Sequence, residues 1–136
     1  MIMKKSIGIF LWGFVLVIAV SGMAAAETIT CTQCGMVSDA GSKFTARMVQ
    51  DGKDLFFCDI GDLLVYMSKK NVQSLQVQVR DYPTGNWIDA HRSFYVQSTR
   101  KFNSPMGWDI AAFRNKQEAA GRGAVMDFEA AMKAVQ

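Results

Sequence analysis

Apolar and polar residues alternate over residues 43–50, which is the pattern of a half-buried β-strand. The apolar positions are Phe44, Ala46 and Met48. A turn signal follows at Asp51-Gly52, and residues 55–58 form a second apolar run. We therefore expect a β-hairpin over residues 43–58.

The apolar spacing changes to that of a helix after Cys58. Four apolar side chains recur on one helical face: Ile60, Leu63, Leu64 and Met67. Asp59 stands at an N-cap position, Asp62 adds negative charge to the first turn, and Lys69-Lys70 adds positive charge to the last turn. These features predict a short amphipathic helix over residues 60–70.

Strand-like alternation returns after this helix. Leu75, Val77 and Val79 alternate with polar residues and predict a third strand. Residues 87–90 and 93–97 predict two strands on either side of a bend at His91-Arg92. Next, we expect a helix that is capped by Asp109, runs through Ile110, Phe113 and Glu118 and ends at Gly121. A short strand over residues 124–128 and a helix over residues 129–136 complete the predicted elements.

The predicted order of hairpin, helix and strand occurs twice, in residues 43–79 and in residues 87–128. This repeat predicts an α+β fold made of two similar, packed ββαβ-like halves, over residues of about 31–82 and 83–136. No low-complexity segment or Gly-Ser linker separates the halves, which favours close packing between them.

The first 26 residues have the layout of a secretory signal. Lys4 and Lys5 precede an apolar run over residues 7–20, and three alanines, residues 24–26, offer a cleavage site. The alternative is a retained membrane anchor, because residues 7–26 are just long enough to span a bilayer. Cleavage leaves 13 basic and 12 acidic residues in residues 27–136. That balance gives no support for nucleic acid as a partner.

Composition supports a small globular protein. Of the 136 residues, 50% are hydrophobic and only two are proline, which excludes a disordered or collagen-like chain. The sequence has no nucleotide-binding, zinc-protease or serine-hydrolase motif, and its carboxylates form no evident acid–base pair. We therefore expect a binding function and not an enzyme. The sequence gives no indication of oligomeric state.

The densest chemical signal is the segment CTQCGM, residues 31–36. The thiols of Cys31 and Cys34 can converge on one metal ion. Met36 adds a soft thioether, which monovalent copper accepts and zinc rarely does. The alternatives are a Cys31–Cys34 disulfide, a thioredoxin-like redox pair, or a structural zinc ion.

Three further residues are weaker candidates for metal binding. Cys58 is expected to be a core residue, and its alternative role is a third thiolate. Met106 lies in a Ser-Pro-Met-Gly turn outside any periodic face, where it serves either packing or metal binding. His91 is the only histidine and is expected at the surface, with metal binding as its alternative. Three cysteines in an exported chain leave at least one thiol without an intramolecular disulfide partner.

Four segments resemble, in order, the successive blocks of the NosL family, the accessory proteins of nitrous oxide reductase. They are CTQCGM at 31–36, LFFCDIGDLLVY at 55–66, WIDAHRSFYV at 87–96 and SPMGWDIAAF at 104–113. The resemblance implies a fold of two ββαβ-like halves. It also implies a periplasmic chaperone that holds one Cu(I) ion and passes it to nitrous oxide reductase during metal-centre assembly, beside a membrane ABC-type partner.

The same resemblance assigns the copper ligands to Cys34, Met36 and Met106, and places Cys31 and Cys58 where family members have cysteines. The sequence lacks the lipobox cysteine of many family members, which implies a soluble periplasmic form. NosL-like proteins are not all tied to nitrous oxide reduction, so another copper protein is the alternative client. Two functions from other classes stay open: a thiol–disulfide oxidoreductase, and an interaction module stabilised by zinc or a disulfide.

Overall fold

The structure is a computed structural model, and it describes residue 22 and residues 25–136. The predicted signal segment falls almost entirely outside these described residues. Within the described part of the chain, no helix is long and apolar enough to cross a membrane.

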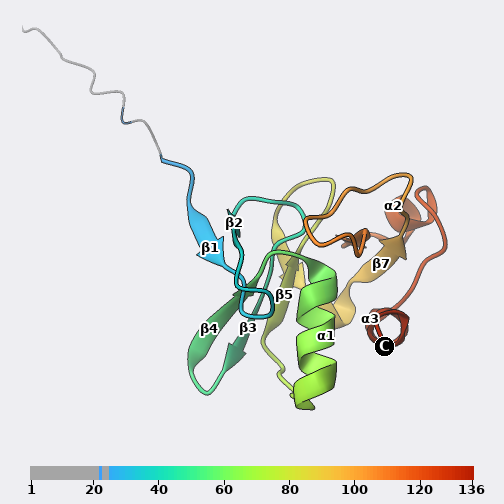
Figure 1. The fold of residues 1–136 in the computed structure, drawn as a ribbon. Helices are drawn as coiled ribbons and strands as arrows, with labels where there is room; N and C mark the ends of the chain where they lie inside the picture. The colour runs from blue at the N-terminus through green and yellow to red at the C-terminus, as the bar shows by residue number, and fades with distance from the viewer. Residues whose placement is uncertain (1–21, 23–24) are drawn as a thin grey trace, which may run out of the picture.

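A four-stranded antiparallel sheet forms the first half (Figure 1). Its strands are β3 (Ala46–Gln50), β4 (Lys53–Phe57), β5 (Val77–Arg80) and β6 (Trp87–Asp89), in the order β4-β3-β5-β6. The predicted hairpin is confirmed, since β3 pairs with β4 through a turn in which Asp51 and Gly52 both have positive φ.

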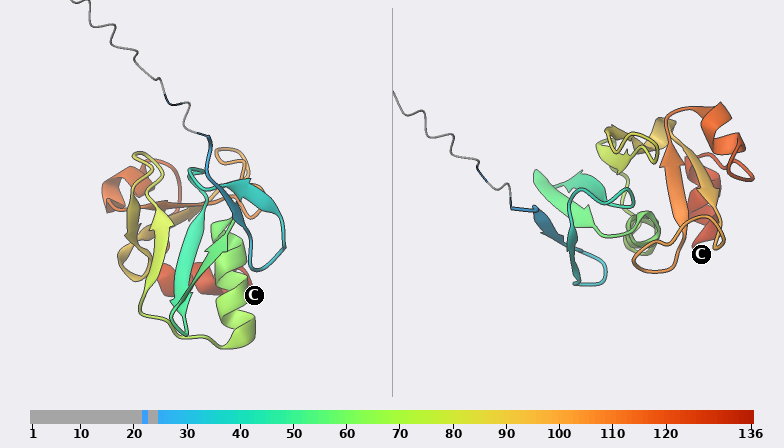
Figure 2. Two further views of the ribbon diagram at one scale, coloured as in Figure 1. Left: turned by 90° about the vertical axis from the view of Figure 1, so that its left-hand side faces the viewer. Right: turned by 90° about the horizontal axis from the view of Figure 1, so that it is seen from above.

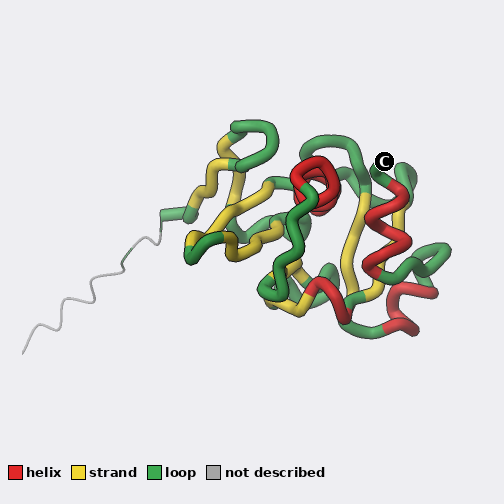
Figure 3. Tube along the Cα trace, turned by 90° about the horizontal axis from the view of Figure 1, so that it is seen from below, coloured by secondary structure: helices red, strands yellow, loops and turns green. Residues whose placement is uncertain are grey.

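Helix α1 (Ile60–Lys70) follows β4, as the spacing of apolar residues predicts. The carboxylate of Asp59 accepts a hydrogen bond from the Gly61 N–H and caps the helix, while Asn71 ends it in a left-handed conformation. The apolar residues of the predicted face are buried at Ile60, Leu63, Leu64 and Met67. The helix contacts β3 and β4 on one side and β8 and α3 on the other, so it lies between the two halves (Figures 2 and 3).

A further hairpin precedes the sheet. Strands β1 (Thr28–Thr30) and β2 (Val37–Asp39) pair in antiparallel register, with Thr30 opposite Val37. The CTQCGM segment is therefore the loop that joins these two strands.

The second half contains a short 3₁₀ turn, η1 (Ala90–Arg92), then β7 (Phe94–Gln97), β8 (Ile110–Phe113), α2 (Lys116–Ala120) and α3 (Phe128–Ala134). Strand β7 pairs with β8, and Tyr95 of β7 also forms an antiparallel bridge with Met126. The predicted C-terminal helix is confirmed as α3.

The expected helix from Asp109 to Gly121 is wrong. Residues 110–113 form β8, and the helix of this region is only α2, which is capped by Asn115. All four residues of β8 are buried. Apolar residues at every position of such a short run show no period that distinguishes a strand from a helix. The predicted strand over residues 124–128 is reduced to the bridge at Met126.

The α+β class and the two similar halves are confirmed, with different strand partners from those expected. The first half runs β3, β4, α1, β5, and the second runs β7, β8, α2 and the segment around Met126. In each half the first strand pairs with both other strands. Strand β6, which was expected to belong to the second half, joins the first sheet beside β5.

Candidate metal centre

The CTQCGM loop is a tight turn held by main-chain hydrogen bonds. The Cys31 N–H donates to the Met36 carbonyl at 2.8 Å, and the Gly35 N–H donates to the Cys31 carbonyl at 2.8 Å. Gly35 has a φ of 76°, a left-handed conformation that glycine adopts without a steric cost. The turn therefore brings the ends of the motif together and turns the Cys34 side chain toward the body of the protein.

A main-chain contact fixes the loop against the end of β4. The Thr32 N–H donates to the Phe56 carbonyl at 2.8 Å. Cys58 follows β4 directly, and Asp62 lies in the first turn of α1. The loop is thereby placed over the start of α1, where residues from three parts of the sequence meet.

Three thiols and one carboxylate converge at this point. The ligand atoms of Cys31, Cys34, Cys58 and Asp62 all lie within 4.8 Å of one another. The Cys34 and Cys58 Sγ atoms are 3.5 Å apart, and the Asp62 Oδ2 atom lies 3.4 Å from Cys31 Sγ and 3.7 Å from Cys58 Sγ. All three cysteines are free thiols. We call these four residues the thiol cluster.

Burial affects the protonation of two thiols of the cluster, those of Cys58 and Cys34. It raises the pKa of the Cys58 thiol strongly, and the neighbouring Cys34 and Cys31 thiols act in the same direction. Burial also raises the pKa of the Cys34 thiol, although a hydrogen bond from the Met36 main chain opposes this effect. Cys34 and Cys58 are therefore thiols at neutral pH, and a metal ion must displace a proton from each that it binds.

The loop that carries Met106 is attached to the same end of α1. The Met106 N–H donates to Asp59 Oδ2 at 3.0 Å, and the Ser104 hydroxyl donates to the same oxygen at 2.5 Å. Asp59 is fully buried, and burial raises the pKa of its carboxyl group against the effect of these donors. The N-cap residue of α1, which directly follows Cys58, therefore holds the Met106 loop against the start of the helix.

Trp108 makes a second attachment. Its indole Nε1–H donates to Asp62 Oδ1 at 3.0 Å, and its side chain packs directly over Gly61, where a Cβ atom would overlap the indole. Gly61 is thus required by the close approach of Trp108 to the helix. The result is that Asp62 contacts Trp108 through one oxygen and the thiols of Cys31 and Cys58 through the other.

The two candidate methionines differ from the thiols in exposure. Met36 is 46% exposed and Met106 is 40% exposed, whereas Cys31 and Cys58 are buried and Cys34 is partly buried. Met36 is in the motif loop, and the Met106 main chain is bonded to the residue that follows Cys58. The structure therefore exposes both methionine side chains to solvent and buries the thiols, fully at Cys31 and Cys58 and partly at Cys34.

His91 lies elsewhere. Its Nε2 atom is 2.8 Å from the Ser74 carbonyl oxygen, and its ring packs on Phe128 with centroids 4.4 Å apart. The imidazole is exposed beside a groove of about 670 Å³ between the end of α1 and α3. It takes no part in the thiol cluster.

The sequence did not indicate the roles of Asp62, Trp108 and Asp59. Asp62 was expected only as a favourable charge in the first turn, and Asp59 only as a cap. The spacing of Cys58 and Asp62, four residues apart across a helix start, was the available signal, because such residues lie on one side of the first turn. No local pattern indicated that Trp108 would reach this turn from the second half.

The geometry does not favour the thioredoxin-like alternative. Cys31 and Cys34 lie in a hairpin loop, not at the start of a helix. Burial raises the pKa of Cys34, whereas disulfide oxidoreductases rely on a lowered thiol pKa. The same geometry favours coordination, in which the metal ion itself supplies the positive charge that stabilises thiolates.

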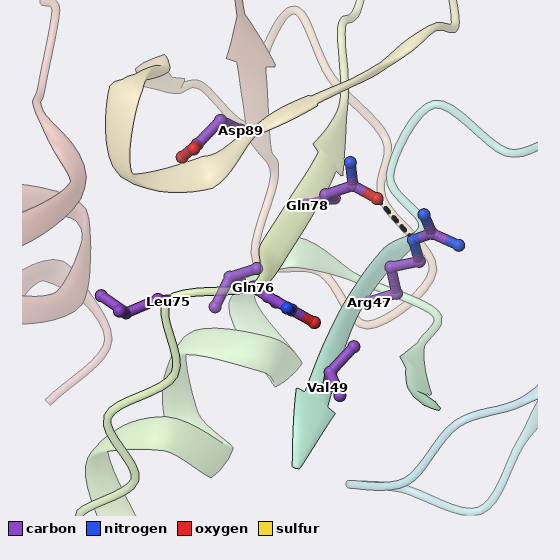
Figure 4. Close-up of a pocket in the computed structure, with 7 residues that line it drawn as sticks. Arg47, Val49, Leu75, Gln76, Gln78 and Asp89 are labelled. Atoms are coloured by element: carbon purple, nitrogen blue, oxygen red, sulfur yellow. Dashed lines mark hydrogen bonds between the residues drawn. The ribbon is translucent and has the colours of Figure 1, made fainter. Parts of the chain in front are cut away.

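Another hollow lies on the outer face of the first sheet (Figure 4). It has a volume of about 320 Å³ and includes Arg47, Gln78 and Asp89. Arg47 Nε donates to Gln78 Oε1 at 2.6 Å, so the arginine is already engaged within the sheet. None of the cluster residues borders this hollow.

Comparison with known proteins gives two matches. The family model described as NosL matches residues 23–130. The fold is similar to the crystal structure of the copper chaperone NosL from Shewanella denitrificans, with a TM-score of 0.64 and 20% sequence identity over 77% of this chain and 91% of that chain. No curated protein sequence matches this one.

Proposed function

This chain belongs to the NosL family, and from that premise we propose that it is a periplasmic copper chaperone that holds one Cu(I) ion and transfers it to a copper enzyme. The observation that carries the proposal is the meeting of three thiols at the start of α1. The exposed Met36 lies in the same loop as two of these thiols, and the main chain of the exposed Met106 is bonded to the N-cap of α1. Cu(I) favours thiolate and thioether ligands over oxygen donors.

We assign the copper position to Cys34, Met36 and Met106. The negative charge of one thiolate neutralises a monovalent cation, and the two thioethers add no charge. The occupied site therefore has no net charge, so its partial burial has a small desolvation cost. Transfer requires that an incoming ligand reach the ion. The exposure of Met36 and Met106 supports such access, because a partner can contact both side chains without unfolding the core.

The attachment of the Met106 loop supports this assignment. Both Ser104 and Met106 donate to Asp59, which caps α1 and adjoins Cys58. Cys58 in turn lies 3.5 Å from Cys34, sulfur to sulfur. These contacts tie the segment that carries Met106 to the segment that carries Cys34.

The proposed setting follows from the N-terminal pattern and the family. The apolar segment over residues 7–20 and the alanines at residues 24–26 support export and release as a soluble periplasmic protein. The proposed client is nitrous oxide reductase, and the proposed membrane partner is an ABC-type assembly complex. The proposed role is delivery of an ion and not catalysis.

The test is a competition titration of reduced protein against a Cu(I) chelator. We expect one tightly bound equivalent in the wild type, no tight binding in Cys34→Ser, and weakened binding in Met36→Ala and Met106→Ala. Met132→Ala is the matched control, since Met132 lies in α3 beside the groove near His91. Unchanged affinity in all three site variants, or no binding in the wild type, would refute the proposal.

A further inference from the structure

The outer face of the first sheet carries two arginines stacked on one tryptophan. Helix α1 packs on the other face of this sheet, so Arg47 of β3, Arg80 of β5 and Trp87 of β6 are partly exposed. The guanidinium carbon of Arg80 lies 3.7 Å from the centroid of the Trp87 ring, and that of Arg47 lies 5.0 Å from it. Trp87 therefore holds two like charges close together at the surface.

The hydrogen-bond partners of both guanidinium groups are uncharged in the described part of the chain. Arg80 donates through its terminal nitrogens to the carbonyl groups of Ala40 at 2.7 Å and Gly85 at 3.1 Å, and its buried Nε has no partner among the described residues. Arg47 donates through Nε to Gln78 Oε1, and Figure 4 shows the end of its guanidinium directed away from Gln78. Burial lowers the pKa of Arg80, and repulsion by Arg47 acts in the same direction. The terminal nitrogens of Arg47 are therefore free to donate to an anion.

Three hollows on this side of the protein share lining residues. The hollow in Figure 4 and a second one of about 440 Å³, between the sheet and β1, are both bordered by Arg47. A third hollow, of about 470 Å³, shares Trp87 with the second and Asp89 with the first. Together they form a concave strip, which we call the arginine groove. Its cations and its tryptophan are Arg47, Arg80, Arg92, Arg114 and Trp87.

The charges that line the arginine groove are mostly positive and of one residue type. Residues 27–136 contain six arginines and seven lysines. Four of these arginines line the groove and none of the lysines does, and the carboxylates that line it are those of Glu27 and Asp89. The groove therefore has an excess of two positive charges, although residues 27–136 as a whole have an excess of one. This excess is complementary to an anionic partner.

The residue types and the shape of the groove indicate the kind of anion. A guanidinium group donates two parallel hydrogen bonds to a planar carboxylate, which a lysine ammonium group does not. A small anion fills only one of the three hollows, and the flat surface of a lipid bilayer does not enter them. An extended polypeptide reaches all three. Arginine and tryptophan are also the residue types that contribute most to binding at protein interfaces.

We propose that the arginine groove is a docking surface for an acidic, extended segment of a partner protein, whose carboxylates pair with the Arg47 guanidinium and its neighbours. No residue of the thiol cluster lines the groove. A docked partner therefore leaves the candidate metal centre accessible. The inference does not depend on the proposed copper function, because it uses none of the proposed copper ligands.

The test measures binding of a synthetic peptide of alternating glutamate and alanine to the reduced, full-length protein. Fluorescence anisotropy of the labelled peptide gives the affinity, and NMR spectra of isotope-labelled protein locate the site through the indole N–H signals of Trp87 and Trp108. We expect binding with a shift of the Trp87 signal and an unchanged Trp108 signal. The same peptide with glutamine in place of glutamate is the peptide control and should not bind.

The variants separate a specific pairing from general attraction between charges. Arg47→Ala is expected to weaken peptide binding by roughly 10- to 100-fold, because it removes hydrogen bonds between charged groups. Arg47→Lys keeps the charge without the planar fork and should lose less. Lys70→Ala is the matched control, since it removes one exposed positive charge from the end of α1, and it should bind as the wild type does. Circular dichroism of each variant separates lost binding from lost folding.

Four results would overturn the inference. They are no binding of the glutamate peptide by wild-type protein, equal weakening by Arg47→Ala and Lys70→Ala, binding of succinate or inorganic phosphate as tight as that of the peptide, and binding of phosphatidylglycerol vesicles in preference to the peptide. The last two results would instead indicate a small-anion site or a membrane-binding surface. Chelator competition distinguishes the two proposals, because Arg47→Ala should retain the Cu(I) affinity of the wild type.

Discussion

Replacing Gly61 by alanine is expected to destabilise the protein, although alanine is the better helix former. Gly→Ala in a helix interior normally adds about 0.5–1 kcal/mol of stability. At Gly61 the new Cβ atom would overlap the Cβ, Cγ and Cδ1 atoms of Trp108, which lie near the main chain and cannot rotate away easily. The indole must therefore leave its place on α1.

The cost of this displacement exceeds the gain in helix propensity. Overpacking costs about 1–3 kcal/mol, and loss of the Trp108 hydrogen bond to Asp62, a bond to a charged group, costs about 1.5–3 kcal/mol. These costs overlap, because relief of the clash breaks the hydrogen bond. We expect a net loss of about 1–3 kcal/mol and, since the displaced segment carries Met106, weaker Cu(I) binding.

Urea denaturation of reduced, metal-free protein measures the first effect, and chelator competition measures the second. Gly121→Ala is the matched control. Gly121 has a helical φ of −66°, and a Cβ atom there would make ordinary contacts of 3.6 and 3.8 Å. It should gain about 0.4–1 kcal/mol with unchanged copper affinity. If Gly61→Ala proves as stable as Gly121→Ala, the close packing of Trp108 on α1 is refuted.

Three further predictions concern the cap and the thiols. Asp59→Asn keeps an oxygen to cap α1 but weakens the contacts with Ser104 and Met106, so urea denaturation should show a loss of about 1–2 kcal/mol and chelator competition a lower Cu(I) affinity. Since burial raises the pKa of Cys58, the folded state holds that proton more tightly than the unfolded state. The contribution of the Cys58 thiol to the stability of the metal-free protein is therefore fully present below the ordinary pKa of 9.0 and is lost as the pH rises above it. In denaturation curves measured at increasing pH, Cys58→Ala should reduce this loss of stability. Because Cys34 is a thiol at neutral pH, binding through its thiolate releases one proton, and apparent Cu(I) affinity should rise about tenfold per pH unit in chelator competition; a pH-independent affinity would contradict coordination by Cys34.

The first half of the fold was predictable because its signals are local. The alternation around Met48, the Asp51-Gly52 turn and the Asp59 cap each specify their own element, and all three agree with the structure. Leu75 is an exception to the local signals: it continues the alternation of β5, yet it precedes the strand and is 92% exposed.

The second half was less predictable because its signals compete. Asp109 reads as a helix cap, but its N–H instead bonds the Ser104 hydroxyl and its carboxylate accepts from the Ser104 N–H. These two hydrogen bonds join the ends of the Met106 loop, and Asp109 adopts a positive φ there. The residue that caps α2 is Asn115, which lies further along the chain. Both residue types suit either role, and tertiary packing of the buried strand β8 decides between them.

The convergence of side chains at the candidate site was only partly predictable. Two cysteines in a six-residue motif with a methionine predict a soft-metal site and mark the loop that forms one side of the cluster. The approach of Cys58 and Asp62 to this motif depends on the pairing of the Thr32 main chain with Phe56, and the approach of Trp108 depends on the docking of the two halves. Contacts between residues that lie far apart in the sequence produce no periodic pattern of apolar residues that could predict them.

The bond from Met106 to Asp59 has a consequence for the order of folding and metal loading. The donor groups of the proposed copper position come from the N-terminal hairpin and from the loop before β8, and this loop is bonded to the start of α1. A chain in which the loop before β8 has not yet docked on α1 lacks the Met106 donor. In the proposed site, complete coordination of copper therefore waits until the two halves have come together.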